Sequence, residues 1–520
     1  PGQPPMVPGN PGEGVESLLA LWDDGSANGL GGKVDLGTGI ATALGQLVAE
    51  ELELPFERVV MLMGDTARAP NQGPTIASAT LQIAAAPLRQ AAAQARAWLK
   101  AQGATPGDDL RDLLRGRHIR LVLDPTTALK PSTEWTVAGQ SLPRVDIPAK
   151  VLGEAHFVHD VRLPGMLHGR VVRPPYAGAD HGEFIGRTLR AVDETSIAHL
   201  PGIVAIVREG DFVGIVAERE EQAEAAMRAL RLDWGDWPAQ PPLTDLASAL
   251  SANPATPRVV AERGDVAAAN AQAPVRLQSR YVWPYQMHAS IGPSCAVAQW
   301  LAQNEAPEPA PAGGTPQDGP APGVRLRVWS GTQNPHVLRA DLALLTGLPD
   351  TAVDVVRLEA AGCYGRNGAD DVTADAALLS RAVGRPVRVQ LTREQEHQWE
   401  PKGAAQLMDV DGSVDADGRL QGWDFQTCYP SNAAPTLALL LTGRVAATAQ
   451  AYAMGDRTSV PPYQVPNLKV TVNDMPPLLR ASWLRGVSAL PNSFAHESFV
   501  DELAHAQGED PLAFRLKHLD

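Results

Sequence analysis

With 520 residues the chain is too long for one ordinary core, so the sequence predicts two to four domains. Hydrophobic residues at 44% and charged residues at 20% are typical of a globular protein and argue against a disordered chain. The formal net charge of −15 disfavours nucleic acid and anionic membranes as partners, because both attract basic surfaces.

A helix and a strand are predicted after a Pro/Gly-rich start. Over residues 40–54 apolar side chains recur on one helical face, and a Pro break then leads to a short apolar strand at Val59–Met63. A second, Ala-rich helix with Pro87 near its start ends at Gly103, where glycine is a common C-cap. Polar, Pro-containing sequence over 117–144 predicts an extended connection.

The next part of the chain mixes strands and helices. Residues 149–237 alternate strand-like runs with a predicted helix at 218–234, which indicates a small α+β domain. Strands are predicted at 276–285 and 294–301. The Pro and Gly density of residues 303–323 then predicts a flexible surface loop.

The last part of the chain predicts a strand, a helix and a second strand between residues 324 and 368. Mixed sequence follows, and two helices are predicted at 493–507 and 510–519. The fold class expected from the whole chain is α+β and multidomain.

The three cysteines, Cys295, Cys363 and Cys428, lie far apart and form no CxxC or CxxCH motif, so we expect no iron–sulfur cluster or c-type haem in this chain. No apolar run approaches the roughly 18 residues of a membrane span, and the start has no apolar core of a signal peptide. The compartment stays open between the two sides of an inner membrane. An opening without Met and a charged, helix-like end lead us to expect a fragment.

The first candidate site is the turn of Gly37, Thr38 and Gly39. It opens a predicted helix, where free backbone N–H groups and the helix dipole favour an anion such as phosphate. Tight turns use glycine for steric reasons more often than for ligands, so an ordinary turn is the alternative.

Two further loops are rich in small residues. The segment "NQGPTIASAT" offers Thr75, Ser78 and exposed amides to a polar cofactor, although a helix N-cap explains either side chain equally well. "GCYGRNGADD", at residues 362–371, crowds small residues around one aromatic, as close approach to a bulky ligand requires. A turn with an acidic cap is its alternative.

Isolated acidic and histidine residues carry weaker signals. A metal site built from Asp370, Asp371 and Asp375 is disfavoured, because acidic first turns of helices are common. His288 and His397 belong to no metal-spaced pair, and a solvated or capped histidine is the simpler interpretation of each. No GxSxG elbow, GxxxxGK[ST] loop or complete GxGxxG after a strand occurs, so hydrolase, NTPase and nicotinamide functions lack their motifs.

Four segments together resemble the xanthine oxidase family of molybdenum hydroxylases. "GGKVDLGTGIATALGQ", with its continuation to Ser78, is similar to that family's pterin-contacting segment, and "HFVHDVRLPGMLHGRVVRPP" to its hammerhead domain. "SGTQNPHVLRADLALLTGLP" resembles the first half of its molybdenum-binding region, and the run from "LRGVSALP" to Asp520 is the fourth match.

The resemblance implies a division of the chain. The expected parts are a flexible lead at 1–30, the pterin-contacting segment at 31–125, a connection at 126–148, the α/β hammerhead domain at 149–240, and a molybdopterin-binding domain at 241–520 with an insertion at 303–323. In most family members the pterin segment lies near the C-terminus, so its early place here implies a circular permutation, which close surface termini tolerate. This order is typical of the nicotinate dehydrogenase and isoquinoline oxidoreductase branch.

The resemblance also implies a cofactor and its contacts. The cofactor is molybdopterin, expected as its cytosine dinucleotide, whose dithiolene holds molybdenum without a direct side-chain ligand. By motif position the cofactor-binding residues are Gly37, Thr38, Gly39, Thr75, Ala77, Ser78, Gln286, Tyr364 and Gly365. Arg485 resembles the arginine that orients substrate.

Three positions depart from the family pattern. Thr38 stands in place of the usual glutamine, so one pterin contact must be lost, remade or bridged by water. Cys363 lies within the glycine-rich loop, and "VSALP" at 487–491 replaces the usual Gly-rich, Pro-Gln step. Pocket shape near that step is therefore left open.

No catalytic residue is identified. Family members end with a Gly-Xaa-Gly-Glu motif whose glutamate is the general base, and none occurs before Asp520, so we expect the base beyond that residue. A positioned base contributes about 10² to 10⁴ in rate, so the chain alone is expected to be nearly inactive. Nothing in the sequence recommends Glu396 or Glu400 for this role.

The implied activity is hydroxylation of an N-heteroaromatic such as a pyridine carboxylate or isoquinoline, or of an aldehyde, with oxygen taken from water. Electrons are expected to pass to a small [2Fe-2S] subunit, with a c-type cytochrome as a candidate acceptor. A non-catalytic cofactor-binding or assembly protein is the alternative. A nucleotide-binding dehydrogenase built on the Gly-rich turn is a third hypothesis.

Overall fold

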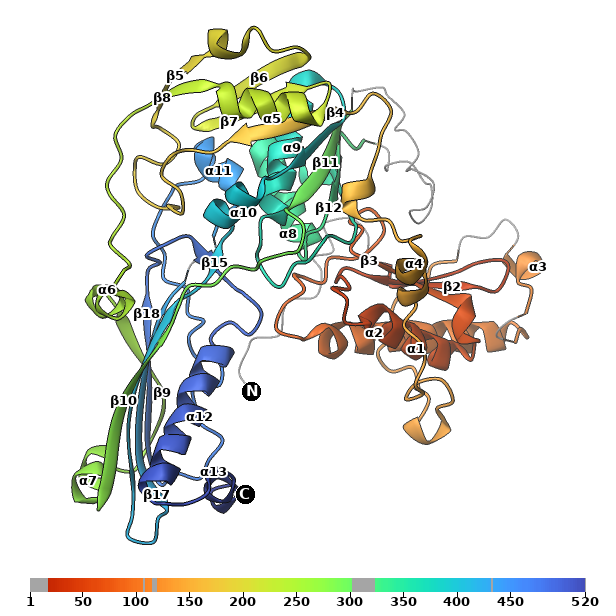
Figure 1. Ribbon diagram of the computed structural model, residues 1–520. Coiled ribbons are helices and arrows are strands. Elements are labelled where there is room, and N and C mark those ends of the chain that lie inside the picture. Colours follow the sequence, from red (N-terminus) through yellow and green to blue (C-terminus); the bar gives the residue numbers. More distant parts are fainter. Residues whose placement is uncertain (1–16, 106–107, 115–118, 302–322, 432–433, 520) are drawn as a thin grey trace.

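The structure is a computed structural model that describes residues 17–105, 108–114, 119–301, 323–431 and 434–519. The predicted loop at 303–323 lies outside these residues except for Gly323, as do residues 1–16 of the lead. Figure 1 shows an N-terminal unit in red and orange beside a central α/β region, from which a long sheet extends. Among the described residues, no helix is long and apolar enough to cross a membrane.

The N-terminal unit is a small three-stranded sheet with two helices on it. The sheet has the order β1 (Leu19–Leu21), β2 (Ala27–Gly31) and β3 (Val59–Met63), and the helices are α1 (Ile40–Leu52) and α2 (Thr80–Ala101). The predicted strand agrees with β3, and the predicted amphipathic helix agrees with α1. The helix forms because its apolar stripe is buried against α2 and β3.

A backbone contact joins this unit to the central region. The backbone of Asp65 forms an antiparallel bridge with Val356, and the Thr66 amide donates to the Val355 carbonyl oxygen over 3.1 Å. The loop after β3 therefore continues the edge of the central sheet.

The central sheet has seven strands in the order β13-β12-β11-β14-β4-β7-β6. Its strands are β4 (Leu167–Val172), β6 (Ile203–Glu209), β7 (Phe212–Ala217), β11 (Cys295–Trp300), β12 (Leu326–Ser330), β13 (Val353–Arg357) and β14 (Val387–Gln390). Strands from both sides of residue 240 share this sheet, because β14 pairs in parallel with β4. The strands before residue 240 and the strands after it thus share one hydrogen-bonded sheet.

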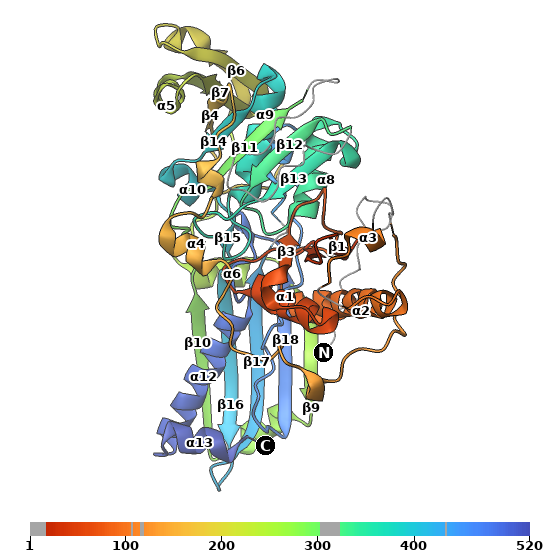
Figure 2. The ribbon, with the colours of Figure 1, turned by 90° about the vertical axis from the view of Figure 1, so that its right-hand side faces the viewer.

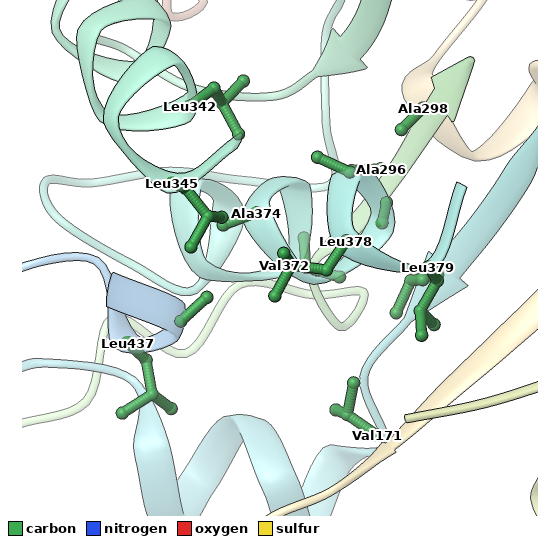
Figure 3. Close-up of a cluster of buried hydrophobic side chains, with 14 of the residues drawn as sticks. Val171, Ala296, Ala298, Leu342, Leu345, Val372, Ala374, Leu378, Leu379 and Leu437 are labelled. Atoms are coloured by element: carbon green, nitrogen blue, oxygen red, sulfur yellow. The ribbon is translucent and has the colours of Figure 1, made fainter. Parts of the chain in front are cut away.

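Helix α9 (Ala369–Val383) is the buried centre of this region, beside α8 (Pro335–Thr346) (Figure 3). Glycines in two strands let the helix approach the sheet closely. A Cβ on Gly169 or Gly214 would lie 2.6 or 2.5 Å from the Leu379 side chain. Small residues at the contact therefore set the helix–sheet distance.

The long sheet has five strands in the order β10-β16-β17-β18-β9 (Figure 2). They are β9 (Thr256–Arg263), β10 (Val275–Trp283), β16 (Gln406–Val414), β17 (Leu420–Pro430) and β18 (Asn467–Met475). Helix α12 (Ala489–Ala506) covers one face, and Gly412 leaves room there for the Phe499 ring, which a Cβ would approach to 2.6 Å. Strands β16 to β18 lie in the stretch for which the sequence predicted no element.

The remaining elements are short. They are α3 (Arg111–Leu114), α4 (Ile147–Leu152), α5 (Glu220–Ala229), α6 (Leu246–Ala252), α7 (Val266–Gln272), α10 (Arg393–Trp399), α11 (Leu437–Leu441), α13 (Pro511–Lys517), β5 (Leu189–Asp193), β8 (Arg231–Trp234), β15 (Lys402–Gly403) and β19 (Ala481–Ser482). The helix predicted over 218–234 is wrong at its end, because its last residues form β8, which pairs with β5. The predicted extended connection is confirmed over most of 119–144, where the short turn Ser132–Glu134 is the one helical element assigned among the described residues.

Candidate functional site

A small cavity lies where the end of β10 meets the strand pair β15–β19. Its lining residues are Trp283, Gln286, Gly403, Ala404, Tyr429, Leu484, Arg485, Val487, Leu490 and Pro491. Two residues with predicted site roles, Gln286 and Arg485, thus face one cavity although they lie about 200 positions apart in the sequence.

Backbone pairing brings these segments together. Gln286 and Gly403 exchange backbone hydrogen bonds of 3.1 and 2.8 Å. Gly403 in turn pairs in parallel with Ser482 through β15 and β19. Because main-chain bonds fix all three segments, the Gln286 side chain is held at a defined place beside the cavity.

The glycine-rich loop joins the same place. Gly365 forms an antiparallel bridge with Leu484, and its φ of +138° is a conformation that side-chain-bearing residues rarely adopt. A Cβ there would lie 2.2 Å from the Trp483 carbonyl oxygen and 2.9 Å from Nε2 of His288. This glycine is therefore required by the close approach of two backbones.

Tyr364 and Arg485 are in contact beside the cavity. The Arg485 amide donates to the Tyr364 carbonyl oxygen over 2.7 Å. Both side chains are exposed, and the guanidinium lies 5.5 Å from the centre of the tyrosine ring. The structure therefore brings Gln286, Tyr364, Gly365 and Arg485 into one neighbourhood.

The loop before α2 is hydrogen-bonded to the residues that follow β2. The Gly32 amide donates to the Gln72 side chain, the Lys33 ammonium to the Pro74 carbonyl, and the Val34 amide to the Thr75 hydroxyl, over 2.9, 2.7 and 2.9 Å. Three successive residues thus hold the loop that contains the predicted Thr75–Ser78 contacts.

Gln333 links that loop to the glycine-rich loop. Its carbonyl oxygen accepts from the Thr75 amide over 3.2 Å, and its side-chain oxygen accepts from the Cys363 thiol over 3.0 Å. Sequence reasoning did not single out Gln333, although it lies inside the quoted "SGTQNPH" run. Two hydrogen bonds through Gln333 therefore connect Thr75 to Cys363, the residue before Tyr364.

Ala77 and Ser78 both have positive φ, of 60° and 56°. Two consecutive non-glycine residues in this conformation form a concave turn immediately before α2. Ser78 is exposed and Ala77 is half-buried.

The turn of Gly37, Thr38 and Gly39 has an internal partner. Asp35 accepts hydrogen bonds from the amides of Gly37, Thr38 and Ala41 over 2.8, 2.9 and 3.0 Å. Gly37 and Thr38 are exposed, and neither lines the cavity of Gln286 and Arg485. Asp35 therefore occupies amides that an anionic ligand would use. An acidic residue two positions before a glycine turn is the sequence feature that could have predicted this contact.

The acidic residues of α9 are engaged in ion pairs. Asp371 binds the Arg480 guanidinium through contacts of 2.9 and 3.0 Å, Asp370 pairs with Arg366, and Asp375 pairs with Arg173. No group of three or more His, Cys, Asp or Glu side chains in the described part of the chain has the geometry of a metal site. These carboxylates are therefore structural.

The two singled-out histidines differ. His397 is exposed, as the simpler interpretation expected. His288 is 4% exposed and contacts the Trp483 carbonyl oxygen through Nε2 over 3.2 Å, so the solvated interpretation of His288 is wrong. Burial lowers the pKa of this imidazole to about 4, which keeps it neutral at pH 7.

The cavity itself holds only about 10 Å³, so its residues could meet one edge of a large planar cofactor and not enclose it. The Ser482 hydroxyl and the Trp483 indole N–H are buried beside the cavity without a protein hydrogen-bond partner. Gly365 lets the backbone of Trp483 and Leu484 approach closely, and Gln286 adds an amide at the cavity wall. Such a mixture of unpaired donors and close backbone matches a pterin with amide edges.

Comparison with known proteins gives two matches to family models, each described as a molybdopterin cofactor-binding domain, at residues 320–519 and 6–115. One subunit of the nicotinate dehydrogenase of Pseudomonas putida is 55% identical over 524 residues, covering 96% of this chain and 42% of that protein. The beta subunit of isoquinoline 1-oxidoreductase from Brevundimonas diminuta is 25% identical, covering 76% of this chain and 48% of that protein.

Two solved structures share the fold. Quinoline 2-oxidoreductase from Pseudomonas putida 86 matches with a TM-score of 0.56 and 18% identity, over 73% of this chain and 50% of that one. Aldehyde oxidoreductase from Desulfovibrio gigas matches with a TM-score of 0.57 and 19% identity, over 88% and 48%. The chain thus spans about half the length, or less, of each of these four proteins. The chain belongs to the xanthine oxidase family through its molybdopterin cofactor-binding domains.

Proposed function

We propose that this chain forms part of a molybdenum hydroxylase that oxidises an N-heteroaromatic of the nicotinate or isoquinoline type. The observation that carries the proposal is the meeting of Gln286 and Arg485 at one cavity, with Tyr364 and Gly365 beside it. The names of the relatives, nicotinate dehydrogenase and isoquinoline 1-oxidoreductase, support this substrate class. An aldehyde is the competing substrate, as in the aldehyde oxidoreductase of similar fold.

The chain's own residues have distinct parts in this proposal. Gln286, Tyr364 and Gly365 would hold the pterin near the cavity. Thr75, Ala77, Ser78 and the Gly37–Gly39 turn would hold more distant parts of the cofactor, which we propose is the cytosine dinucleotide form. When bound, the cofactor supplies the metal-centred oxidation that inserts water-derived oxygen. Arg485 would orient substrate, because an exposed guanidinium forms bidentate bonds with a carboxylate such as that of nicotinate.

The arrangement of the full protein is also proposed. The family-model match at 6–115 precedes the match at 320–519, which supports a permuted order with the pterin segment before a hammerhead domain at 149–240. Relatives named as subunits support a partner, for which we propose a small [2Fe-2S] protein with a c-type cytochrome as acceptor. We place the general base in a segment that follows Asp520.

A cofactor-binding protein without turnover is the second candidate. One observation favours it: Asp35 already occupies the amides of Gly37 and Thr38, and Thr38 itself offers only a hydroxyl. The pterin contact at this turn would then be weaker than in the catalytic members of the family.

Purified full-length protein separates the two candidates. Molybdenum and pterin content per chain would be measured together with dye-coupled oxidation of nicotinate, isoquinoline and an aldehyde. Stoichiometric molybdenum with heteroaromatic turnover is the expected result. Stoichiometric molybdenum without any turnover supports the second candidate, and absence of both molybdenum and pterin contradicts both.

A further inference from the structure

A buried acid and a buried imidazole face each other behind the cavity. The His288 and Glu400 side chains are both 0% exposed, and Nδ1 of His288 lies 3.9 Å from Oε2 of Glu400. Neither of these two atoms has a hydrogen-bond partner of good geometry, although the Pro401 carbonyl also faces the imidazole and the Ala289 amide the carboxyl. Oε1 of Glu400 accepts from the His288 amide over 3.0 Å. Buried polar atoms are normally hydrogen-bonded, so two unsatisfied polar atoms this close together need an explanation.

The contact of the other ring nitrogen favours a proton on Nε2. Nε2 of His288 lies 3.2 Å from the Trp483 carbonyl oxygen, which can only accept. A neutral imidazole that donates from Nε2 has an unprotonated Nδ1, which can only accept a hydrogen bond. The Glu400 carboxyl can donate this bond when protonated, and a closure of about 1 Å gives an ordinary O–H···N distance.

The surrounding charges are compatible with this state. Burial raises the pKa of Glu400 to about 7, the neighbouring Glu396 acts in the same direction, and Lys402 opposes both. Burial lowers the pKa of His288 to about 4, and Lys402 and Arg366 act in the same direction. Near pH 6 the carboxyl is therefore protonated while the imidazole is neutral.

His288 and Glu400 lie close in sequence to residues that line the cavity. Gln286, two residues before His288, pairs with Gly403, three residues after Glu400. His288 also packs against Gly365, whose added Cβ would lie 2.9 Å from Nε2. A change in the pair therefore moves the segments that line the cavity.

We propose that Glu400 and His288 are positioning residues for this cavity, joined by a hydrogen bond from a neutral carboxyl to Nδ1 that is broken when Glu400 ionises. The inference deepens the proposed function by naming what holds Gln286 in place. Its test needs neither bound cofactor nor turnover, so a failure of the pair and a failure of the proposed function are distinguishable.

Infrared difference spectroscopy on the full-length protein tests the carboxyl. A protonated carboxyl C=O band that fades with a midpoint near pH 7 is expected in the wild type and lost in Glu400→Gln. In Glu396→Gln the band should remain with a lower midpoint, because the Glu396 charge raises the pKa of Glu400. In His288→Phe the midpoint should fall by about one pH unit, because the neutral acid loses its acceptor. A band unaffected by Glu400→Gln, or a midpoint unchanged in His288→Phe, would overturn the proposal.

Nitrogen NMR of wild-type protein labelled at histidine tests the imidazole, and a variant is needed only to assign its signals. His288, assigned by loss of its signals in His288→Gln, should carry its proton on Nε2, and its Nδ1 shift should change as Glu400 titrates. A proton on Nδ1, donated to the Pro401 carbonyl that also faces the ring, contradicts the pair. The pH profile of nicotinate turnover then reports the effect of the pair on the cavity. In the wild type kcat/KM should fall as pH rises through 7, because the bond breaks when Glu400 ionises, and Glu400→Gln should remove this fall.

Discussion

The Arg485 amide donates to the carbonyl oxygen of Tyr364 over 2.7 Å, and the Arg485 guanidinium lies 5.5 Å from the centre of the Tyr364 ring. One main-chain bond thus sets the distance between the residue proposed to orient substrate and the loop proposed to hold the cofactor. Because both side chains are exposed, neither is needed for the core.

Replacement of Arg485 should lower kcat/KM for the substrate and leave the free energy of unfolding nearly unchanged. In Arg485→Met we expect kcat/KM for nicotinate to fall roughly 10- to 100-fold, since one charged hydrogen-bonding group contributes about 1.5 to 3 kcal/mol. The free energy of unfolding should change by less than about 1 kcal/mol. Arg276→Met is the matched exposed-arginine control, and a kcat/KM unaffected by Arg485→Met would remove Arg485 from the substrate site.

Gly365 should tolerate no side chain. Gly365→Ala places a Cβ 2.2 Å from the Trp483 carbonyl oxygen, so we expect a loss of about 2 to 4 kcal/mol in urea unfolding. Gly37→Ala is the control: its φ is also positive, at +88°, but no atom lies within 4 Å of the added Cβ, so the loss should be near 1 kcal/mol. Equal losses in the two variants would mean that the close approach at Gly365 is unimportant.

The Asp371–Arg480 pair should stabilise the strands beneath the cavity. Arg480 is 1% exposed and Asp371 is 2% exposed, so Asp371→Asn leaves a buried guanidinium without its counter-charge and should cost about 3 to 5 kcal/mol. Asp409→Asn breaks the exposed pair with Arg280 and should cost at most about 1 kcal/mol. Urea unfolding measures both, and similar small values would show that the buried pair is not stabilising.

Glu400 should make stability depend on pH. Its pKa is raised to about 7 from the ordinary value of 4.5, so the stabilisation of its protonated form is complete below pH 4.5 and is lost as pH rises through 7. Glu400→Gln removes this loss, so the variant should gain about 1 to 3 kcal/mol relative to wild type between pH 5 and pH 8.

Thermal unfolding at several pH values checks this result. The exposed Glu394→Gln serves as control and should leave the pH dependence unchanged. Parallel stability curves for wild type and Glu400→Gln would show that Glu400 is ionised throughout the range.

Local patterns in the sequence were sufficient for several elements. Helix α1 and strand β3 follow from residue spacing and a Pro break, because neighbours in sequence decide periodicity and capping. The β8 strand was assigned to a helix because Arg231–Trp234 continues the helical pattern, and only its pairing with β5 overrides that preference. Family membership also came from the sequence, through motifs that comparison with relatives confirms.

The tertiary structure alone decided which residues meet. Glu400 had no feature that recommended it, because its chemistry depends on His288, 112 residues away, and on burial that no local pattern reports. Gln286 and Arg485 share a cavity because β15 and β19 pair between them, and Asp35 takes the amides of the Gly37 turn through its folded geometry. Spacing determines local conformation, whereas long-range pairing and loss of solvent determine proximity and pKa, and the chain acquires these only on folding.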